Sequence, residues 1–271
     1  MVKILTHNIN GIRAILKKDN IIDNKTNKKN TYLNYIKKEN PDIICFNELK
    51  ICQEKYNKEF IKELLPEYQY KCFNLSCEKR GYSGVSIFSK IEPLSFCTKL
   101  EDNSTGRYTI MEFEKFILIC VYVINSGEKL KNLDKRALWD KQFIKKIKQL
   151  QKDISKEIII TGDMNVINRE IDTHDFKSQH NKLAGVSNIE IGGFQKLIRE
   201  TKLIDAWLEL KKPKVQYSYF THRFNARQHN KGMRIDYFLM NKKLLKKIKN
   251  IEIDNNIYGS DHLPIILDID L

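Results

Sequence analysis

Residues 158–165 read Ile-Ile-Ile-Thr-Gly-Asp-Met-Asn, and this stretch decides how the chain can fold. The β-branched apolar run at 158–161 predicts a buried central strand. Gly162 permits a sharp turn of the backbone, which would place Asp163 and Asn165 just past the carboxyl end of that strand. Open α/β sheets keep their chemistry at this edge. Acids follow many ordinary strands, so the stretch indicates a site only if other strands end in matching polar residues.

Apolar segments on both sides of this stretch predict further strands. They cover residues 2–5, 42–46, 68–73, 85–89, 94–98, 108–113, 116–123, 217–220, 234–240, 248–253 and 263–269. Apolar residues at helical spacing predict helices over residues 32–40, 53–65 and 133–150, and around Phe194, Leu197 and Ile198. Residues 17–31 are polar and show no period, so we expect a loop there.

The mixture of many strands with a few one-faced helices predicts an α/β fold. Glu114-Lys115 is a hairpin candidate between two of the strands, and antiparallel hairpins argue against a purely doubly wound sheet. We therefore expect a four-layer α/β sandwich, in which two mostly antiparallel β-sheets pack face to face with helices outside. Because no linker or internal repeat divides the chain, residues 1–271 are expected to form one domain.

The composition permits a nucleic-acid partner without proving one. The net charge is +14, but most of the 48 basic residues are lysines in a chain crowded with Lys, Asn and Ile, so bulk charge is weak evidence. The chain shows neither a leader-like start nor an apolar run of membrane-spanning length. We expect a soluble, intracellular protein of the nucleus or cytoplasm, with no membrane partner. The six cysteines lack metal-finger spacing, which predicts buried, reduced thiols.

Polar side chains recur where the predicted strands end. They are Asn8, Glu48, Tyr122 with Asn125, Asp163 with Asn165, Asp236, and Asp261 with His262. Each one alone is most simply a loop or cap residue, and their joint recurrence is the evidence for a site. Oxygen ligands such as Glu48, Asn8 and Asp261 suit Mg²⁺ or Mn²⁺ rather than zinc. An Asp/Asn pair can orient a water, and a histidine held by an aspartate can stabilise a charged phosphoryl group. Together these groups indicate phosphodiester hydrolysis.

Seven short blocks of the sequence resemble the signature of a known superfamily. They are residues 8–14 (Asn-Ile-Asn-Gly-Ile-Arg-Ala), 47–50 (Asn-Glu-Leu-Lys), 80–85 (Arg-Gly-Tyr-Ser-Gly-Val), 122–127 (Tyr-Val-Ile-Asn-Ser-Gly), 162–165 (Gly-Asp-Met-Asn), 234–238 (Arg-Ile-Asp-Tyr-Phe) and 259–262 (Gly-Ser-Asp-His). In this order they resemble the endonuclease/exonuclease/phosphatase superfamily, and within it the exonuclease III-type apurinic/apyrimidinic endonucleases. Because the seven blocks occur in the family's order over nearly the whole chain, chance does not explain the resemblance.

The resemblance implies a DNA repair nuclease that acts as a monomer on double-stranded DNA containing abasic sites. It would hydrolyse the phosphodiester 5′ to the abasic site, with additional 3′-5′ exonuclease or 3′-phosphodiesterase activity. Glu48 would bind the metal, with Asn8 and Asp261 close to the same ion. Asp163 would orient or deprotonate the attacking water, and Asn165 would fix that carboxylate and the scissile phosphate; both are also expected near the metal.

The remaining catalytic positions follow from the same resemblance. His262 would hydrogen-bond a phosphate oxygen, and Asp236 would hold its imidazole. Tyr122 and Asn125 would complete the phosphate cradle, the tyrosine acting either as a phenolate or as a donor. Residues implied in substrate binding are Asn10, Arg13, Lys50, Tyr82, Arg107, Asn125, Arg136, Tyr219, Arg223, Phe224, Asn225, Met233 and Ile235.

Several of these positions carry more detailed expectations. Lys50 would tune the metal-bound carboxylate, and Arg107 and Arg136 would contact the DNA backbone. The pocket for the abasic sugar would be walled by Tyr219, Met233 and Ile235, with Arg223 or Phe224 as the wedge that enters the duplex. Family members often carry an aromatic ring where this chain has Met233, which is more flexible. Asn10 stands where some members carry an aspartate, which leaves a second metal site open.

Two other classes of protein compete with this reading. Phosphatases or phosphodiesterases of the same fold act on phosphoinositides, sphingomyelin or RNA, but the phosphatases carry a proline- and cysteine-bearing block that is absent near residues 232–236. A catalytically silent nucleic-acid-binding module would also explain the basic charge. It is disfavoured because each expected catalytic position holds a competent residue.

Overall fold

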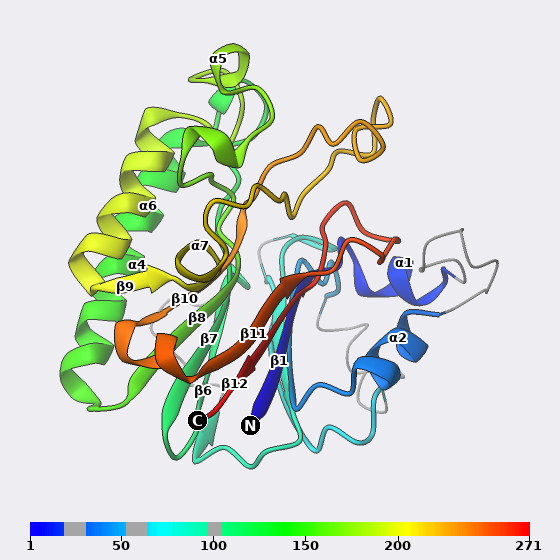
Figure 1. Ribbon diagram of the computed structural model, residues 1–271, viewed down its shortest axis with the longest axis vertical. Coiled ribbons are helices and arrows are strands. Elements are labelled where there is room, and N and C mark those ends of the chain that lie inside the picture. Colours follow the sequence, from blue (N-terminus) through cyan, green and yellow to red (C-terminus); the bar gives the residue numbers. More distant parts are fainter. Residues whose placement is uncertain (19–30, 53–63, 78, 97–104) are drawn as a thin grey trace.

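The computed structural model describes residues 1–18, 31–52, 64–77, 79–96 and 105–271, and in it two six-stranded sheets pack face to face (Figure 1). The first sheet has the order β11-β12-β1-β2-β4-β3. Its strands are β1 (Val2–Asn8), β2 (Ile43–Asn47), β3 (Tyr70–Asn74), β4 (Val85–Ser89), β11 (Ile248–Ile253) and β12 (Ile265–Ile269). The pair β1–β2 runs parallel and the other pairs of this sheet run antiparallel.

The second sheet has the order β5-β6-β7-β8-β10-β9. Its strands are β5 (Ser95–Phe96), β6 (Tyr108–Glu112), β7 (Phe116–Tyr122), β8 (Glu157–Asp163), β9 (Leu203–Asp205) and β10 (Asp236–Asn241). Here β7–β8 is parallel and the other pairs are antiparallel, with a hairpin at Glu114-Lys115 between β6 and β7. The prediction of two mostly antiparallel sheets is therefore confirmed.

Helices cover the outer face of each sheet. Those against the first sheet are α1 (Ile12–Leu16) and α2 (Tyr32–Glu39), and those against the second are α4 (Leu133–Asp153) and α6 (Asn188–Thr201) (Figure 1). The short helices are η2 (Glu128–Leu130), η3 (Glu170–Asp172), α5 (Phe176–Gln179), α7 (Ala206–Lys211) and η4 (Lys242–Lys247). The four-layer sandwich predicted from the sequence is thus the fold.

The isoleucine run of β8 shows why this sequence needs four layers. Ile159 packs into the core between the two sheets, whereas Ile158 and Ile160 point outward and pack under α4 and α6. All three are fully buried. Successive side chains of a strand alternate between faces, so an uninterrupted apolar run requires cover on both sides.

Other predictions need correction. Residues 217–220 were expected to form a strand, but Tyr219 makes only isolated bridges, to Met233 and to His262. The reason is that Ser218 turns its hydroxyl and backbone toward the polar edge of β10 instead of continuing a ladder. Residues 168–187, for which the sequence predicts neither a strand nor a helix, contain η3 and α5. The helix expected at 53–65 and most of the 17–31 loop lie outside the described residues.

The cysteines agree only in part with the expected buried thiols. Cys45 and Cys120 are free and buried between the sheets. Of the other two free thiols, Cys52 is half-buried and Cys77 is exposed. Cys72 is buried but disulfide-bonded, so the prediction of a reduced thiol is wrong there. Spacing along the chain does not reveal which cysteines meet in three dimensions. Within the described part of the chain, none of the helices has the length and apolar character to cross a membrane.

A buried ion-pair network joins β10 to the loops beside it. The guanidinium of Arg234 lies 2.8 Å from Asp205 Oδ2 and 3.0 Å from Asp172 Oδ2, and all three side chains are at most 3% exposed. Burial would raise the pKa of Asp172, but Arg234 and Arg169 hold it below its usual value. Asp172 therefore stabilises the fold above its unfolded pKa of about 3.9, and this contribution is lost as the pH falls through the lowered folded-state pKa.

We expect Arg234→Met to reduce the free energy of unfolding by about 3–5 kcal/mol, because Asp205 would remain buried without its cation and Asp172 would keep only Arg169. Urea denaturation at neutral pH measures the effect, with the exposed Arg199→Met on α6 as the matched control. A loss no larger than that of the control would show that the network contributes nothing to stability.

Candidate functional site

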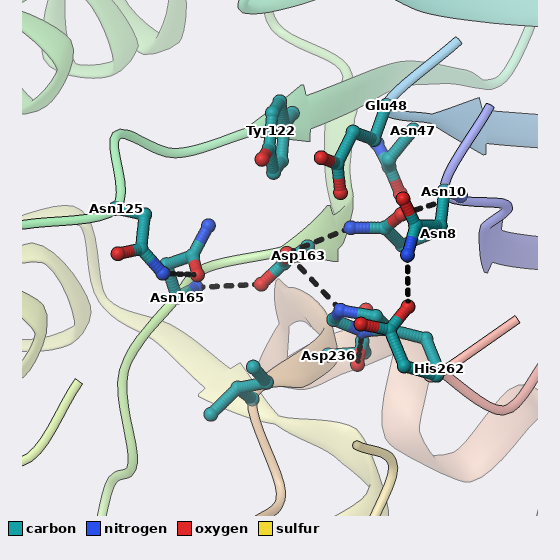
Figure 2. A network of polar contacts seen from close by, with 12 residues as sticks. Asn8, Asn10, Asn47, Glu48, Tyr122, Asn125, Asp163, Asn165, Asp236 and His262 are labelled. Carbon is teal, nitrogen blue, oxygen red and sulfur yellow. Dashed lines mark hydrogen bonds and ion pairs between the residues drawn. The ribbon is translucent and has the colours of Figure 1, made fainter. Parts of the chain in front are cut away.

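The strand order brings the polar strand ends to one edge of the sandwich. In the parallel pair β1–β2, Asn8 lies opposite Asn47, and in β7–β8, Tyr122 lies opposite Asp163. β10 runs antiparallel to β8, so its first residue, Asp236, also lies opposite Asp163. The carboxyl ends of four strands and the start of another therefore meet, and sequence positions 8 to 236 become neighbours (Figure 2).

Gly162 allows β7 and the end of β8 to approach this closely. Its φ is +131°, and a Cβ built there would lie 2.1 Å from the carbonyl oxygen of Val121 and 2.8 Å from Asn47 Nδ2. Any side chain would push the two sheets apart at the site. The glycine that the sequence indicated as a turn residue is therefore required by close packing directly behind Asp163.

Asp163 lies at the centre of the polar network (Figure 2). Its Oδ2 accepts a hydrogen bond of 2.9 Å from Asn8 Nδ2, and its Oδ1 accepts one of 2.7 Å from the backbone N–H of Asn165. His262 Nε2 lies 3.8 Å from Oδ2. Burial raises the pKa of Asp163 to about 7, against the opposing effect of the His262 charge. A carboxyl group with such a pKa can exchange a proton at neutral pH.

His262 is held by a second buried acid. Its Nδ1 donates to Asp236 Oδ2 over 2.8 Å, and the hydroxyl of Ser218 donates to the same oxygen over 2.7 Å. Burial alone would lower the pKa of His262, but the carboxylates of Asp236 and Asp163 raise it to about 10. The imidazole is therefore a cation at neutral pH. Ser218 was missed from the sequence, where a lone hydroxyl among aromatic residues gave little signal.

His7 holds the backbone of His262 in place by a hydrogen bond. Its Nε2 lies 3.1 Å from the carbonyl oxygen of His262, and its Nδ1 lies 2.7 Å from the hydroxyl of Tyr32. A carbonyl only accepts, so Nε2 carries the proton and Nδ1 accepts from the tyrosine. Burial lowers the pKa of His7 to about 4, which keeps it neutral. His7 is therefore a buried core residue that supports the site.

A second group of polar residues forms an acidic cradle beside Asp163. Lys50 Nζ lies 2.9 Å from Glu48 Oε1 and also donates to the side-chain oxygen of Asn10. Asn10 Nδ2 in turn donates to Asp261 Oδ1 over 2.8 Å. The backbone of Asn10, Glu48 and Lys50 is left-handed, with φ between 47° and 56°. Strained backbone of this kind is typical of functional sites.

The donor set of the cradle fits a hard cation. Glu48 and Asp261 offer carboxylate oxygens, and an ammonium group already lies against Glu48. Among the described residues, Asp163, Asp236 and His262 also bring ligand atoms within 4.8 Å of one another. A metal bound between these three residues would have to displace a proton from His262, whose imidazole is ion-paired to Asp163 and to Asp236. Mg²⁺ prefers oxygen ligands, so the acidic cradle fits this ion better than the group that contains His262. Asn8 engages both ends of its amide, with Asp163 and with the backbone of Asn10.

Two side-chain amides form the opposite wall. Asn125 Nδ2 donates to Asn165 Oδ1 over 2.7 Å, and Asn165 Nδ2 donates to the carbonyl oxygen of Val123 over 2.9 Å. Tyr122 stands between this amide pair and the acidic cradle (Figure 2). Burial, with the charges of Glu48 and Asp163, raises the pKa of Tyr122, so the group is a neutral phenol. Of the two roles left open by the sequence, the structure favours the donor.

Arg107 and Arg136 were expected to contact the DNA backbone, and the structure corrects both expectations. They are only 3% and 1% exposed. The guanidinium carbon of Arg107 lies 4.9 Å from the ring centre of Tyr82 and 4.8 Å from that of Tyr122. Its N–H groups donate to the hydroxyl oxygen of Tyr82 and to the backbone carbonyl oxygen of Tyr122. Arg136 is ion-paired to Asp140. Both guanidinium groups are occupied inside the protein.

Five of the remaining predicted residues line a cavity of about 800 Å³ that opens over Asp163 and His262. Tyr219, Met233 and Ile235 line it, and Arg223 and Phe224 stand at its rim. Phe224 is 87% exposed. Three predicted contacts are exposed but do not line the cavity: Arg13, Tyr82 and Asn225. Lining residues that were not among the predicted substrate contacts include Lys129, His174, Lys182 and Lys231.

Comparisons with known proteins agree with this geometry. The endonuclease/exonuclease/phosphatase family matches residues 5–262. The DNA repair nuclease APEX1 of Danio rerio is 36% identical over 98% of this chain and 81% of its own length. The exodeoxyribonuclease of Bacillus subtilis is 33% identical over 100% of both chains. An AP endonuclease structure from Archaeoglobus fulgidus, 24% identical, superposes over 100% of both chains with a TM-score of 0.81, which shows the fold. The chain therefore belongs to the endonuclease/exonuclease/phosphatase family, as an exonuclease III-type member.

Proposed function

We propose that this chain is a monomeric, single-domain DNA repair nuclease that cleaves duplex DNA 5′ to abasic sites and trims 3′ ends. Relatives named as a DNA repair nuclease and as an exodeoxyribonuclease support the nuclease assignment. The observation that carries the proposal is the buried chain of Asp163, His262 and Asp236, which pairs a carboxyl of near-neutral pKa with a cationic imidazole at the floor of a cavity.

The reaction would begin with the removal of a proton from water by Asp163. The water oxygen forms a bond to the phosphorus on the 5′ side of the abasic sugar, and the bond from phosphorus to the O3′ of the preceding nucleotide breaks. That O3′ takes up a proton, which leaves a 3′ hydroxyl and a 5′-phosphorylated abasic end. The hydrogen bond from the backbone N–H of Asn165 to Oδ1, with the one from Asn8 to Oδ2, would hold the Asp163 carboxylate in place for this proton transfer.

The other groups of the site would bind and neutralise the phosphate. The imidazolium of His262 donates to a non-bridging oxygen, where negative charge grows in the transition state. Tyr122 and Asn125 add neutral donors on the other side. Glu48 and Asp261, with Asn8 beside them, would hold a Mg²⁺ or Mn²⁺ ion, which supplies Lewis-acid stabilisation of the same charge.

The walls of the cavity support an abasic sugar as the group bound beside the phosphate. Tyr219, Met233 and Ile235 offer an apolar surface next to His262, and the ring of Tyr219 lies 4.9 Å from the imidazole. Phe224, in a left-handed turn and almost fully exposed, is placed to enter a duplex at the position of a missing base.

We expect the protein to nick a duplex with one tetrahydrofuran abasic analogue in the presence of Mg²⁺, and EDTA to abolish the nick. Denaturing gel electrophoresis measures the products, and returning Mg²⁺ or Mn²⁺ in excess over EDTA should restore them. An undamaged duplex with recessed 3′ ends, run in parallel, ranks exonuclease against endonuclease activity. An uncut abasic duplex alongside release of phosphate from inositol phosphates would contradict the proposal.

A further inference from the structure

Arg136, on the first turn of α4, reaches the backbone behind the amide pair. Its Nη1 donates to the carbonyl oxygen of Ile124 over 2.9 Å and to that of Asn165 over 3.3 Å. These carbonyls belong to the residue that precedes Asn125 and to Asn165 itself. One guanidinium group therefore fixes the backbone of both amide residues, while its Nε is neutralised by Asp140 at 2.8 Å. Arg136 does not line the cavity.

Glu190, on α6, joins the loop that carries Asn125 to the segment that precedes α6. It is fully buried, and its carboxylate accepts from Ser126 Oγ at 2.7 Å, from the Gly185 N–H at 2.9 Å and from Ser187 Oγ at 2.6 Å. The capping box of α6 uses other bonds, from the Ser187 N–H to Glu190 Oε2 and from the Glu190 N–H to Ser187 Oγ. Helix capping does not require the bonds to Ser126, which follows Asn125, and to Gly185, whose carbonyl oxygen accepts from the Ile167 N–H close to Asn165. Glu190 Oε1 is 4.0 Å from Arg136 Nη1.

Packing of α4 on α6 does not explain this buried charge. Phe143, Ile144 and Ile147 of α4 and Phe194 and Leu197 of α6 already share one apolar cluster. Buried ion pairs are weak evidence for stability, because their desolvation opposes their attraction. The polar bonds of Arg136 and Glu190 instead converge on the loops behind Asn125 and Asn165.

We infer that Arg136 and Glu190 are positioning residues for DNA cleavage, which fix the distance and orientation of the Asn125–Asn165 amide pair. The inference rests on the proposed function, in which this pair binds the scissile phosphate. Neither residue touches the substrate. Arg136 acts through the backbone of Ile124 and Asn165, and Glu190 acts through Ser126 and Gly185. A loop held in the reactive geometry before DNA binds avoids an ordering cost in the transition state.

Arg136→Lys keeps the charge but can reach only one of the two carbonyls. We expect it to lower kcat on the abasic duplex by about 10- to 100-fold, with KM for DNA changed by less than about 3-fold. Glu190→Gln, which retains the capping bonds, should show the same pattern with a smaller loss. In Arg136→Ala, added methylguanidinium should restore part of the lost kcat, and it should leave the wild-type rate unchanged.

Ile147→Ala, a cavity in the α4 core away from the site, controls for lost stability and should leave kcat unchanged. The side-chain amide NMR signals of Asn125 and Asn165 give a readout independent of activity, and we expect them to broaden or shift in Arg136→Lys. Unchanged signals with wild-type kcat would overturn the inference, as would a kcat loss equal to that of Ile147→Ala. Failure of the wild-type protein to cut the abasic duplex would instead count against the proposed function, while altered amide signals would still support the positioning role.

Discussion

Asp163→Asn is expected to lower kcat for cleavage of the abasic duplex by about 10²–10⁴-fold, the usual contribution of a general base. The asparagine can still accept from the Asn165 N–H through its Oδ1, as Asp163 does now. It cannot take a proton from water. Because a negative charge next to the phosphate is also removed, KM for DNA should stay the same or fall.

The same substitution should not unfold the protein. The Asp163 carboxylate is buried at a desolvation cost that raises its pKa to about 7, and a neutral amide of the same size escapes that cost. Against this gain, the new Nδ2 would face the donor Nδ2 of Asn8 where Asp163 Oδ2 now accepts, so we expect an unchanged or slightly lowered melting temperature. Single-turnover rates and thermal unfolding are the measurements, with the exposed Asp153→Asn at the end of α4 as control. A rate within tenfold of the wild-type rate would remove Asp163 from the role of base.

The fold could be predicted because its strands carry the simplest sequence pattern. β8 and β7 are uninterrupted apolar runs, which only cover on both faces can bury, and the polar residues at their ends mark the edge where the site lies. Every one of the expected catalytic side chains lies at that edge. What the pattern could not supply was their distances, because Asn8 and Asp163 are 155 residues apart in sequence yet 2.9 Å apart in space.

The errors at Arg107 and Arg136 have different physical origins. Arg136 and Asp140 are four residues apart on an expected helix, so the sequence did contain a signal for an internal ion pair. Arg107 gave no such signal, since its partners Tyr82 and Tyr122 are on separate strands and loops. An arginine near a predicted site can thus bind phosphate or support the residues that do, and only its burial separates the two cases.

His262→Ala is expected to lower kcat by about 10²–10³-fold, the usual cost of removing one donor from a developing oxyanion. The raised pKa of His262, about 10, means that the lost group is a full positive charge and not merely a hydrogen bond. Asp236 Oδ2 would lose its hydrogen bond from His262 and keep the one from Ser218. His262→Gln, which retains an N–H donor without the charge, should recover part of the rate.

Asp236 would act on the phosphate only through His262, to which it is hydrogen-bonded. A double variant can therefore test the roles of the two residues together. Asp236→Asn alone should reduce kcat less than His262→Ala, because the imidazole would remain with a weaker partner. If the acid acts solely by holding and charging the imidazole, the double variant should be no slower than His262→Ala. His229→Ala, exposed on the loop that carries Phe224, serves as the control for the loss of a histidine. Additive losses in the double variant would show instead that Asp236 has an effect of its own on the reaction, independent of the imidazole 2.8 Å away.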